Sequence, residues 1–139
     1  MIGARGSSLL ALLLVSHGCG PDTRAGECAK IARAVNARLD RVEAAYRAAP
    51  PSKADWTGIA NQYKALAREL RSRKIVDPRL VPMMKEYALL ADLAANNAMI
   101  VAGAQRNGKP LEQPLAVLRQ QAEQHARLSQ RIDRTCRSQ

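Results

Sequence analysis

Apolar residues recur every three or four positions in four separate segments of this chain, and this spacing limits what it can fold into. An α-helix has 3.6 residues per turn, so residues at this spacing lie on one side of a helix and leave the other side to charged residues. Breaks rich in proline and glycine separate the segments at Pro50-Pro51, Asp77-Pro78 and Asn107-Gly108-Lys109-Pro110. The sequence therefore predicts four amphipathic helices joined by short connections.

The apolar positions and the start signals define each predicted helix. Ser52, with Asp55 three residues later, predicts the start of the second helix, and Asp77 before Pro78 predicts the start of the third. The inward-facing positions are Cys28, Ile31, Val35, Leu39, Val42 and Tyr46 in the first helix, Trp56, Ile59, Tyr63, Leu66 and Leu70 in the second, Leu80, Met84, Tyr87, Ala91, Ala94, Ala98 and Val101 in the third, and Leu111, Leu115, Leu118, Ala122, His125, Ser129, Ile132 and Cys136 in the fourth.

The length and composition favour one all-α domain. The chain has 139 residues and no Phe, and aromatic residues make up only 3% of it, so the core must consist of small and aliphatic side chains. Short connections force consecutive helices to run antiparallel as neighbours. We therefore expect an antiparallel up-down-up-down four-helix bundle over residues 28–139.

The N-terminus has the pattern of an export signal. Arg5 precedes an apolar run at residues 9–15, which is much shorter than the roughly 20 residues that span a bilayer. The small residues Ser16 and Gly18 come just before Cys19, and small residues are typical of a signal-peptidase cleavage site. We predict a signal peptide over residues 1–18, cleavage between Gly18 and Cys19, and a short linker over residues 19–27.

The Gly18-Cys19 junction resembles that of the bacterial lipoprotein class. In that class the cysteine after the cleavage site is lipid-modified and becomes the mature N-terminus, so the resemblance implies an acyl-anchored protein of the cell envelope, on the periplasmic or extracellular face. The usual leucine three residues before the cysteine is Ser16 here. The alternative is an ordinary cleavage site at Ser16-His17-Gly18, which would release a soluble, secreted basic helical protein.

The cysteine count agrees with a lipid-modified Cys19. Three cysteines in an exported protein leave one unpaired, and modification of Cys19 leaves Cys28 and Cys136 as a pair. The up-down-up-down order places the start of the first helix and the end of the fourth at the same end of the bundle. We therefore predict a disulfide between Cys28 and Cys136.

The positive charge of the chain is concentrated at this end. The formal net charge of +10 would ordinarily indicate nucleic acid as a partner, but export argues against it. An anchor at Cys19 would instead hold the basic end near the membrane, where it could contact anionic lipid headgroups or other envelope polyanions. The predicted contact residues are Arg71, Arg73, Lys74, Arg131, Arg134 and Arg137.

No catalytic or cofactor motif is apparent in the sequence. Ser129 lies one turn from His125, but no further triad member accompanies them. The best interpretation is a non-enzymatic interaction or scaffold module without a cofactor, whose protein partner the sequence does not identify. The alternative from another class is a periplasmic haem- or metal-binding bundle that uses His125, together with a methionine such as Met84.

Overall fold

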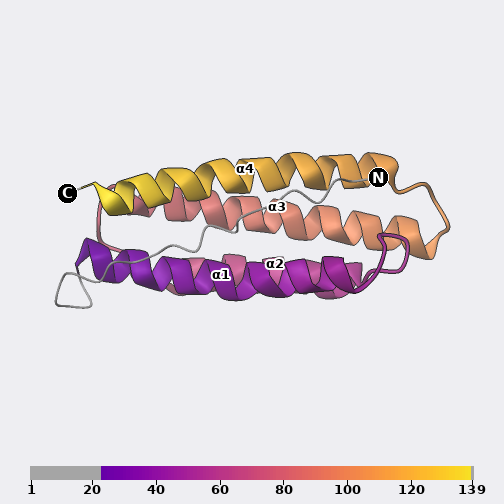
Figure 1. Cartoon of the computed structure of the whole chain (residues 1–139), viewed down its shortest axis with the longest axis horizontal. Helices are drawn as coiled ribbons and strands as arrows, with labels where there is room; N and C mark the ends of the chain where they lie inside the picture. The colour runs from indigo at the N-terminus through magenta and orange to yellow at the C-terminus, as the bar shows by residue number, and fades with distance from the viewer. Residues whose placement is uncertain (1–22, 139) are drawn as a thin grey trace.

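The computed structural model describes residues 23–138 as four antiparallel helices. They are α1 (Arg24–Ala48), α2 (Trp56–Ser72), α3 (Leu80–Arg106) and α4 (Glu112–Arg137). Each helix packs against the next in the chain, and α4 also contacts α1. Figure 1 shows their axes nearly parallel, with the start of α1 and the end of α4 at the same end of the bundle. The prediction of an all-α up-down-up-down four-helix bundle is confirmed, whereas the signal peptide and Cys19 lie outside the described residues.

The helices start at other residues than the sequence predicts. α1 begins at Arg24, inside the predicted linker, because the Thr23 side chain accepts a hydrogen bond from the Gly26 N–H (3.1 Å). In α2, Asp55 is the cap instead of Ser52, and its carboxylate accepts from the Gly58 N–H (2.8 Å). A turn at residues 78–79 delays the start of α3 to Leu80. A side-chain cap is therefore present at α2, three residues after the predicted one, whereas Arg79, the N-cap of α3, makes no capping hydrogen bond through its side chain.

The core consists of small and aliphatic residues in two clusters. One lies toward the end of the bundle that holds Cys28, and the other surrounds Trp56 toward the opposite end. All seven positions predicted to face inward on α3 are buried, and the last four of them are three alanines and a valine. Short side chains let neighbouring helices approach closely.

The buried side of α4 differs from the predicted one. Ala122 is exposed, whereas Gln121 and Leu128 are buried beside Leu118, His125 and Ile132. These buried positions are spaced three and four residues apart in alternation, as in antiparallel helices that pack knobs into holes. The prediction failed at Gln121 because a polar residue gives no hydrophobic signal.

Candidate functional site

A disulfide joins α1 to α4 at one end of the bundle. Cys28 and Cys136 are bonded, their Cα atoms are 6.0 Å apart, and they are separated by 108 residues. The interface between α1 and α4 is the smallest among the four pairs of neighbouring helices. The covalent link therefore secures the pair of helices that packing holds least well. We call this region, with the α2–α3 loop that crosses it, the disulfide end.

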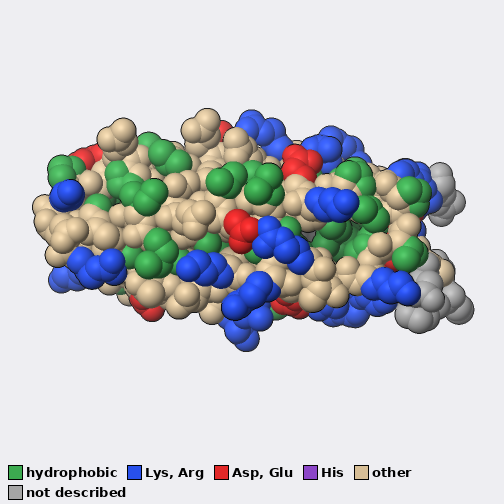
Figure 2. Space-filling model, turned by 180° about the vertical axis from the view of Figure 1, so that it is seen from behind, with side chains coloured by type: hydrophobic (Ala, Val, Ile, Leu, Met, Phe, Trp, Pro, Cys, Tyr) green, Lys and Arg blue, Asp and Glu red, His purple; other side chains and the backbone are tan. Residues whose placement is uncertain are grey.

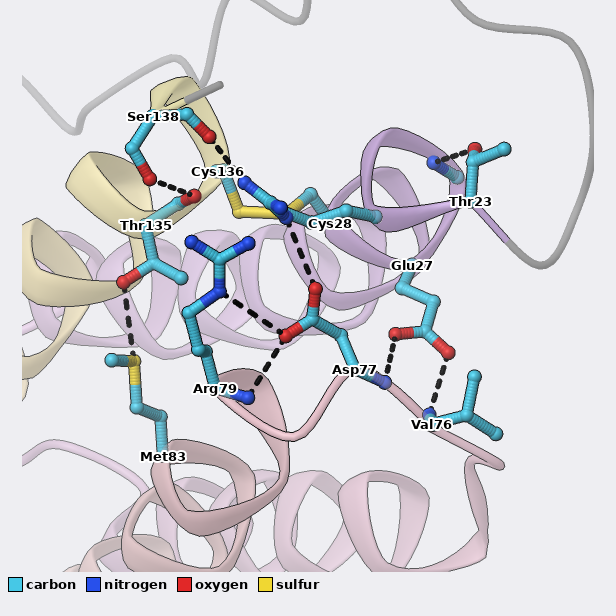
Figure 3. Close-up of polar contacts among 12 residues, drawn as sticks. Thr23, Glu27, Cys28, Val76, Asp77, Arg79, Met83, Thr135, Cys136 and Ser138 are labelled. Carbon is cyan, nitrogen blue, oxygen red and sulfur yellow. Dashed lines mark hydrogen bonds and ion pairs between the residues drawn. A yellow bond between two sulfur atoms is a disulfide. The ribbon is translucent and has the colours of Figure 1, made fainter.

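A buried carboxylate beside the disulfide holds the α2–α3 loop. The Glu27 side chain, in a residue only 2% exposed, accepts hydrogen bonds from the backbone N–H groups of Val76 (2.6 Å) and Asp77 (3.0 Å). Figure 3 shows this carboxylate directed from α1 toward the loop. The sequence analysis missed Glu27; the available signal was an acidic residue next to Cys28 on the apolar side of the helix.

Ion pairs around Asp77 extend these contacts to the end of α4. The Asp77 carboxylate accepts from Arg24 Nε (3.0 Å) and forms a longer ion pair with Arg79 Nε (3.7 Å). Arg24 also donates to the backbone carbonyl of Ser138, which follows the last residue of α4. The start of α1, the α2–α3 loop and the C-terminal end of α4 are thus joined by one polar network.

Four of the six basic residues predicted to contact a membrane form ion pairs. Arg71 pairs with Asp92, Arg73 with Glu69 (2.6 Å), Arg131 with Glu86 (3.0 Å) and Arg137 with Asp133 (2.9 Å). A hydrogen bond from Arg73 lowers the pKa of Glu69, and a hydrogen bond to Asp92 raises the pKa of Arg71.

Lys74 and Arg134 have no acidic partner among residues 23–138. The ion pairs partly neutralise the positive charge of the other four predicted contact residues. The disulfide end is therefore less positive than a count of its basic residues indicates, and these two are its uncompensated predicted contacts.

A second polar group lies inside the bundle at His125. The residue is 6% exposed, and its ring packs against those of Tyr87 (centroids 5.2 Å apart) and Tyr63 (5.9 Å). Neither ring nitrogen has a hydrogen-bond partner of good geometry, and the same holds for Gln121 Oε1 one turn earlier. Burial lowers the pKa of His125, although the backbone of Leu90 acts in the opposite direction. The imidazole is therefore stabilised in its neutral form.

Ser129, one turn from His125 on α4, is hydrogen-bonded to a residue of another helix. The Ser129 hydroxyl shares a hydrogen bond with the Tyr87 hydroxyl (3.2 Å). Residues 23–138 contain no group of three or more His, Cys, Asp or Glu side chains that could hold a metal ion. His125 is thus a buried imidazole between two aromatic rings.

The fold and these contacts define a disulfide-closed four-helix bundle with a polar network at one end and a buried histidine between its helices. No protein-family profile matches the chain, and neither a curated protein nor a solved structure matches it.

Proposed function

We propose that this protein is a lipoprotein of the bacterial cell envelope that acts as a non-enzymatic interaction or scaffold module. The observation that supports the lipid anchor is the pairing of Cys28 with Cys136. It leaves Cys19 as the one cysteine without a partner in the chain, and an unpaired thiol is unusual in an exported protein. The Gly18-Cys19 junction is where that class carries its lipid.

Mass spectrometry of the exported protein tests the anchor. We expect a mature N-terminus at Cys19 that carries the added mass of acyl chains, and protein that sediments with membranes. The Cys19→Ser variant should lack the added mass and leave the membrane fraction. An unmodified Cys19 in soluble material would instead support the secreted alternative.

The proposed anchor would hold the disulfide end close to the bilayer. α1 begins at Arg24, so residues 19–23 separate the anchor from the bundle by at most about 17 Å. We propose that Lys74 and Arg134, the uncompensated cations of this end, contact anionic headgroups. Each cation near such a surface adds up to about 1 kcal/mol.

Vesicle binding by the Cys19→Ser protein tests this orientation. We expect binding to vesicles with anionic lipid that weakens as salt rises, and weaker binding after Lys74→Glu with Arg134→Glu. Arg106→Glu with Arg119→Glu is the matched control, because it changes the charge by the same amount at two exposed residues toward the opposite end of the bundle. Equal binding to neutral vesicles, or an equal effect of this control variant, would contradict the proposed orientation.

One observation favours a second candidate, a periplasmic haem- or metal-binding bundle. The unpartnered ring nitrogens of His125 could ligate a metal, since neutral imidazole is a common metal ligand. A visible absorbance band in the purified protein, lost in His125→Ala, would support this candidate. A colourless protein that neither haem nor divalent metal titration alters would exclude it.

A further inference from the structure

The outward face of α3 carries a stripe of apolar residues that no other described helix covers. Leu89, Leu93 and Ile100 are 58%, 44% and 58% exposed, and Asn96 is exposed between them. Their successive spacing of four, three and four residues places them in one row along the helix, roughly 17 Å long. We call these four residues the α3 stripe.

α3 has the composition of a helix with neighbours on all sides. Between Glu86 and Arg106 it contains one charged residue, Asp92, which is paired with Arg71 of α2. It is also the one described helix that is long and apolar enough to span a membrane, although it packs in the bundle as a core helix. A helix that is apolar around its whole circumference is normally buried. The α3 stripe is therefore the side of this helix that lacks a neighbour.

Basic residues without acidic partners flank the α3 stripe. The Arg71–Asp92 pair aligns α2 with α3, so Arg68 and Lys64, one and two turns before Arg71 on α2, lie beside the stripe. Lys64, Arg68 and the nearby Lys85 of α3 are exposed and form no ion pair within residues 23–138. Arg71 is the one cation of this flank that is paired. Figure 2 shows hydrophobic side chains along this side of the molecule, with many Lys and Arg and a few Asp and Glu side chains among them.

The α4 side of the stripe carries mainly neutral and basic residues, with one exposed acidic residue, Glu123, one turn before Arg127. The Arg131–Glu86 pair sets the alignment of α4 with α3, and Arg127, one turn earlier on α4, is exposed and unpaired within the described chain. Gln120 and Gln124 continue this flank without charge. A surface that is apolar along its centre and basic at both edges complements a ligand that is apolar at its centre and acidic at its edges.

We propose that the α3 stripe docks an amphipathic helix of a partner protein that carries acidic residues on both sides of its apolar row. A second copy of this chain would bring Lys64, Arg68 and their counterparts against cations of the same kind, and like charges oppose association. A lipid surface would have to bury the Asn96 amide without a hydrogen-bond partner. A partner helix can supply one, and a single asparagine in an apolar seam is a known means of setting helix register.

This inference names the partner class for the proposed interaction module, and so rests on that role, but it does not require the lipid anchor. The test therefore uses the exported Cys19→Ser protein with its disulfide intact. The probe is a fluorescent peptide of about three heptads, with Leu at the a and d positions except for one Asn, and Glu at e and g. A matched peptide with Lys in place of each Glu is the control ligand.

We expect the acidic peptide to bind and the basic peptide not to bind, as measured by fluorescence anisotropy. Leu93→Ser combined with Ile100→Ser should weaken binding by about tenfold or more, since both side chains lose apolar contact with the peptide. Lys64→Gln combined with Arg68→Gln should weaken it and reduce its salt dependence. Val76→Ser, at an exposed apolar residue of the α2–α3 loop, should leave the affinity unchanged.

Circular dichroism confirms that each variant is folded. Failure of the acidic peptide to bind, or equal binding of both peptides, overturns the proposal. Dimerisation abolished by Leu93→Ser assigns the α3 stripe to a second copy, and vesicle binding abolished by the same change assigns it to lipid. Each of these results leaves the lipid anchor at Cys19 untouched, so the two proposals fail separately.

Discussion

The Glu27 carboxylate has two oxygens, and each accepts one backbone N–H from the α2–α3 loop. A buried N–H that loses its acceptor costs about 1–3 kcal/mol, because water can no longer replace the lost bond. The loop therefore depends on an acidic side chain from a helix about 50 residues earlier in the sequence. An amide cannot serve both donors, since it offers one acceptor and one NH₂ group.

We predict that Glu27→Gln and Glu27→Ala each lower the free energy of unfolding by about 1–3 kcal/mol, with Ala the more severe. Chemical denaturation monitored by circular dichroism measures the difference. Glu123→Gln is the control, because Glu123 is exposed and forms no ion pair within residues 23–138, so it should change stability little. If Glu27→Gln matched this control, the two loop hydrogen bonds would contribute nothing to stability.

His125 should make the stability of the fold depend on pH. Its pKa is lowered in the folded protein by burial, so the unfolded chain binds a proton more readily than the folded one. The free energy of unfolding should therefore fall as the pH drops below the ordinary value of 6.5, until the pH reaches the lowered folded pKa. The slope can reach about 1.4 kcal/mol per pH unit for one proton.

Denaturation at a series of pH values in wild type and His125→Gln checks this prediction. The variant should lose the slope just below pH 6.5, while both proteins keep any loss due to Glu69. The pKa of Glu69 is lowered below 4.5, so its contribution is present above pH 4.5 and is lost at still lower pH. An unchanged slope in His125→Gln would mean that burial does not lower the pKa of His125 in the folded state.

At the scale of one helix, Asp55 and Gly58 together form the start of α2. The Asp55 carboxylate caps the Gly58 N–H, and a Cβ atom added at Gly58 would lie 2.2 Å from Asp55 Oδ2. The capping side chain, as it is placed here, leaves no room for a Cβ atom at position 58, so a larger residue there would require the Asp55 carboxylate to move. Without that side chain, alanine should be favoured over glycine, since glycine is about 1 kcal/mol less favourable inside a helix.

A double-mutant cycle tests this coupling between Asp55 and Gly58. We predict that Asp55→Ala lowers the free energy of unfolding by about 1 kcal/mol. Gly58→Ala should lower it in the wild-type background but raise it in the Asp55→Ala background. Thermal or chemical denaturation of the four proteins gives the coupling free energy. Additive effects would mean that the cap and the glycine act independently.

The helices were predictable from sequence to the extent that local signals determine them. Every residue of α3 that the apolar spacing predicted to be buried is buried. The predicted break at Gly108 lies where the backbone takes a positive φ of 61°. The sequence analysis passed over the local cap at Thr23, and it could not show that Arg24 and Glu27 have partners in the distant α2–α3 loop. Gln121 was missed because its burial depends on how α4 is rotated against its neighbours.

The candidate sites were also predictable only where the sequence itself carries the signal. Cysteine count and helix order were enough to predict the Cys28–Cys136 bond, because both are properties of the chain as a whole. Which basic residues lack an acidic partner was not predictable, since this depends on ion pairs such as Arg131–Glu86 between different helices. The α3 stripe became visible only when the structure showed which side of that helix has no neighbour.

At the scale of the whole molecule, the disulfide closes the bundle at its least packed seam. α1 is held by its interface with α2, by a small contact with α4 and by the bond from Cys28 to Cys136. A link that closes a loop of this length restricts the unfolded chain strongly, by about 4–5 kcal/mol in the chain-entropy model. In the folded protein the same link prevents α1 from separating from α4 while it remains on α2.

We predict that Cys28→Ser combined with Cys136→Ser lowers the free energy of unfolding by about 4–5 kcal/mol, and that α1 then becomes the first helix to open. Denaturation measures the loss of stability, and hydrogen exchange read by mass spectrometry locates it. Exchange should rise more in α1 than in α3, because α3 is packed between α2 and α4. The Cys19→Ser protein, which keeps the bond, should retain the protection of α1. If α1 and α3 lost protection equally in the double variant, the bundle would open as one unit and the seam between α1 and α4 would not be its weak point.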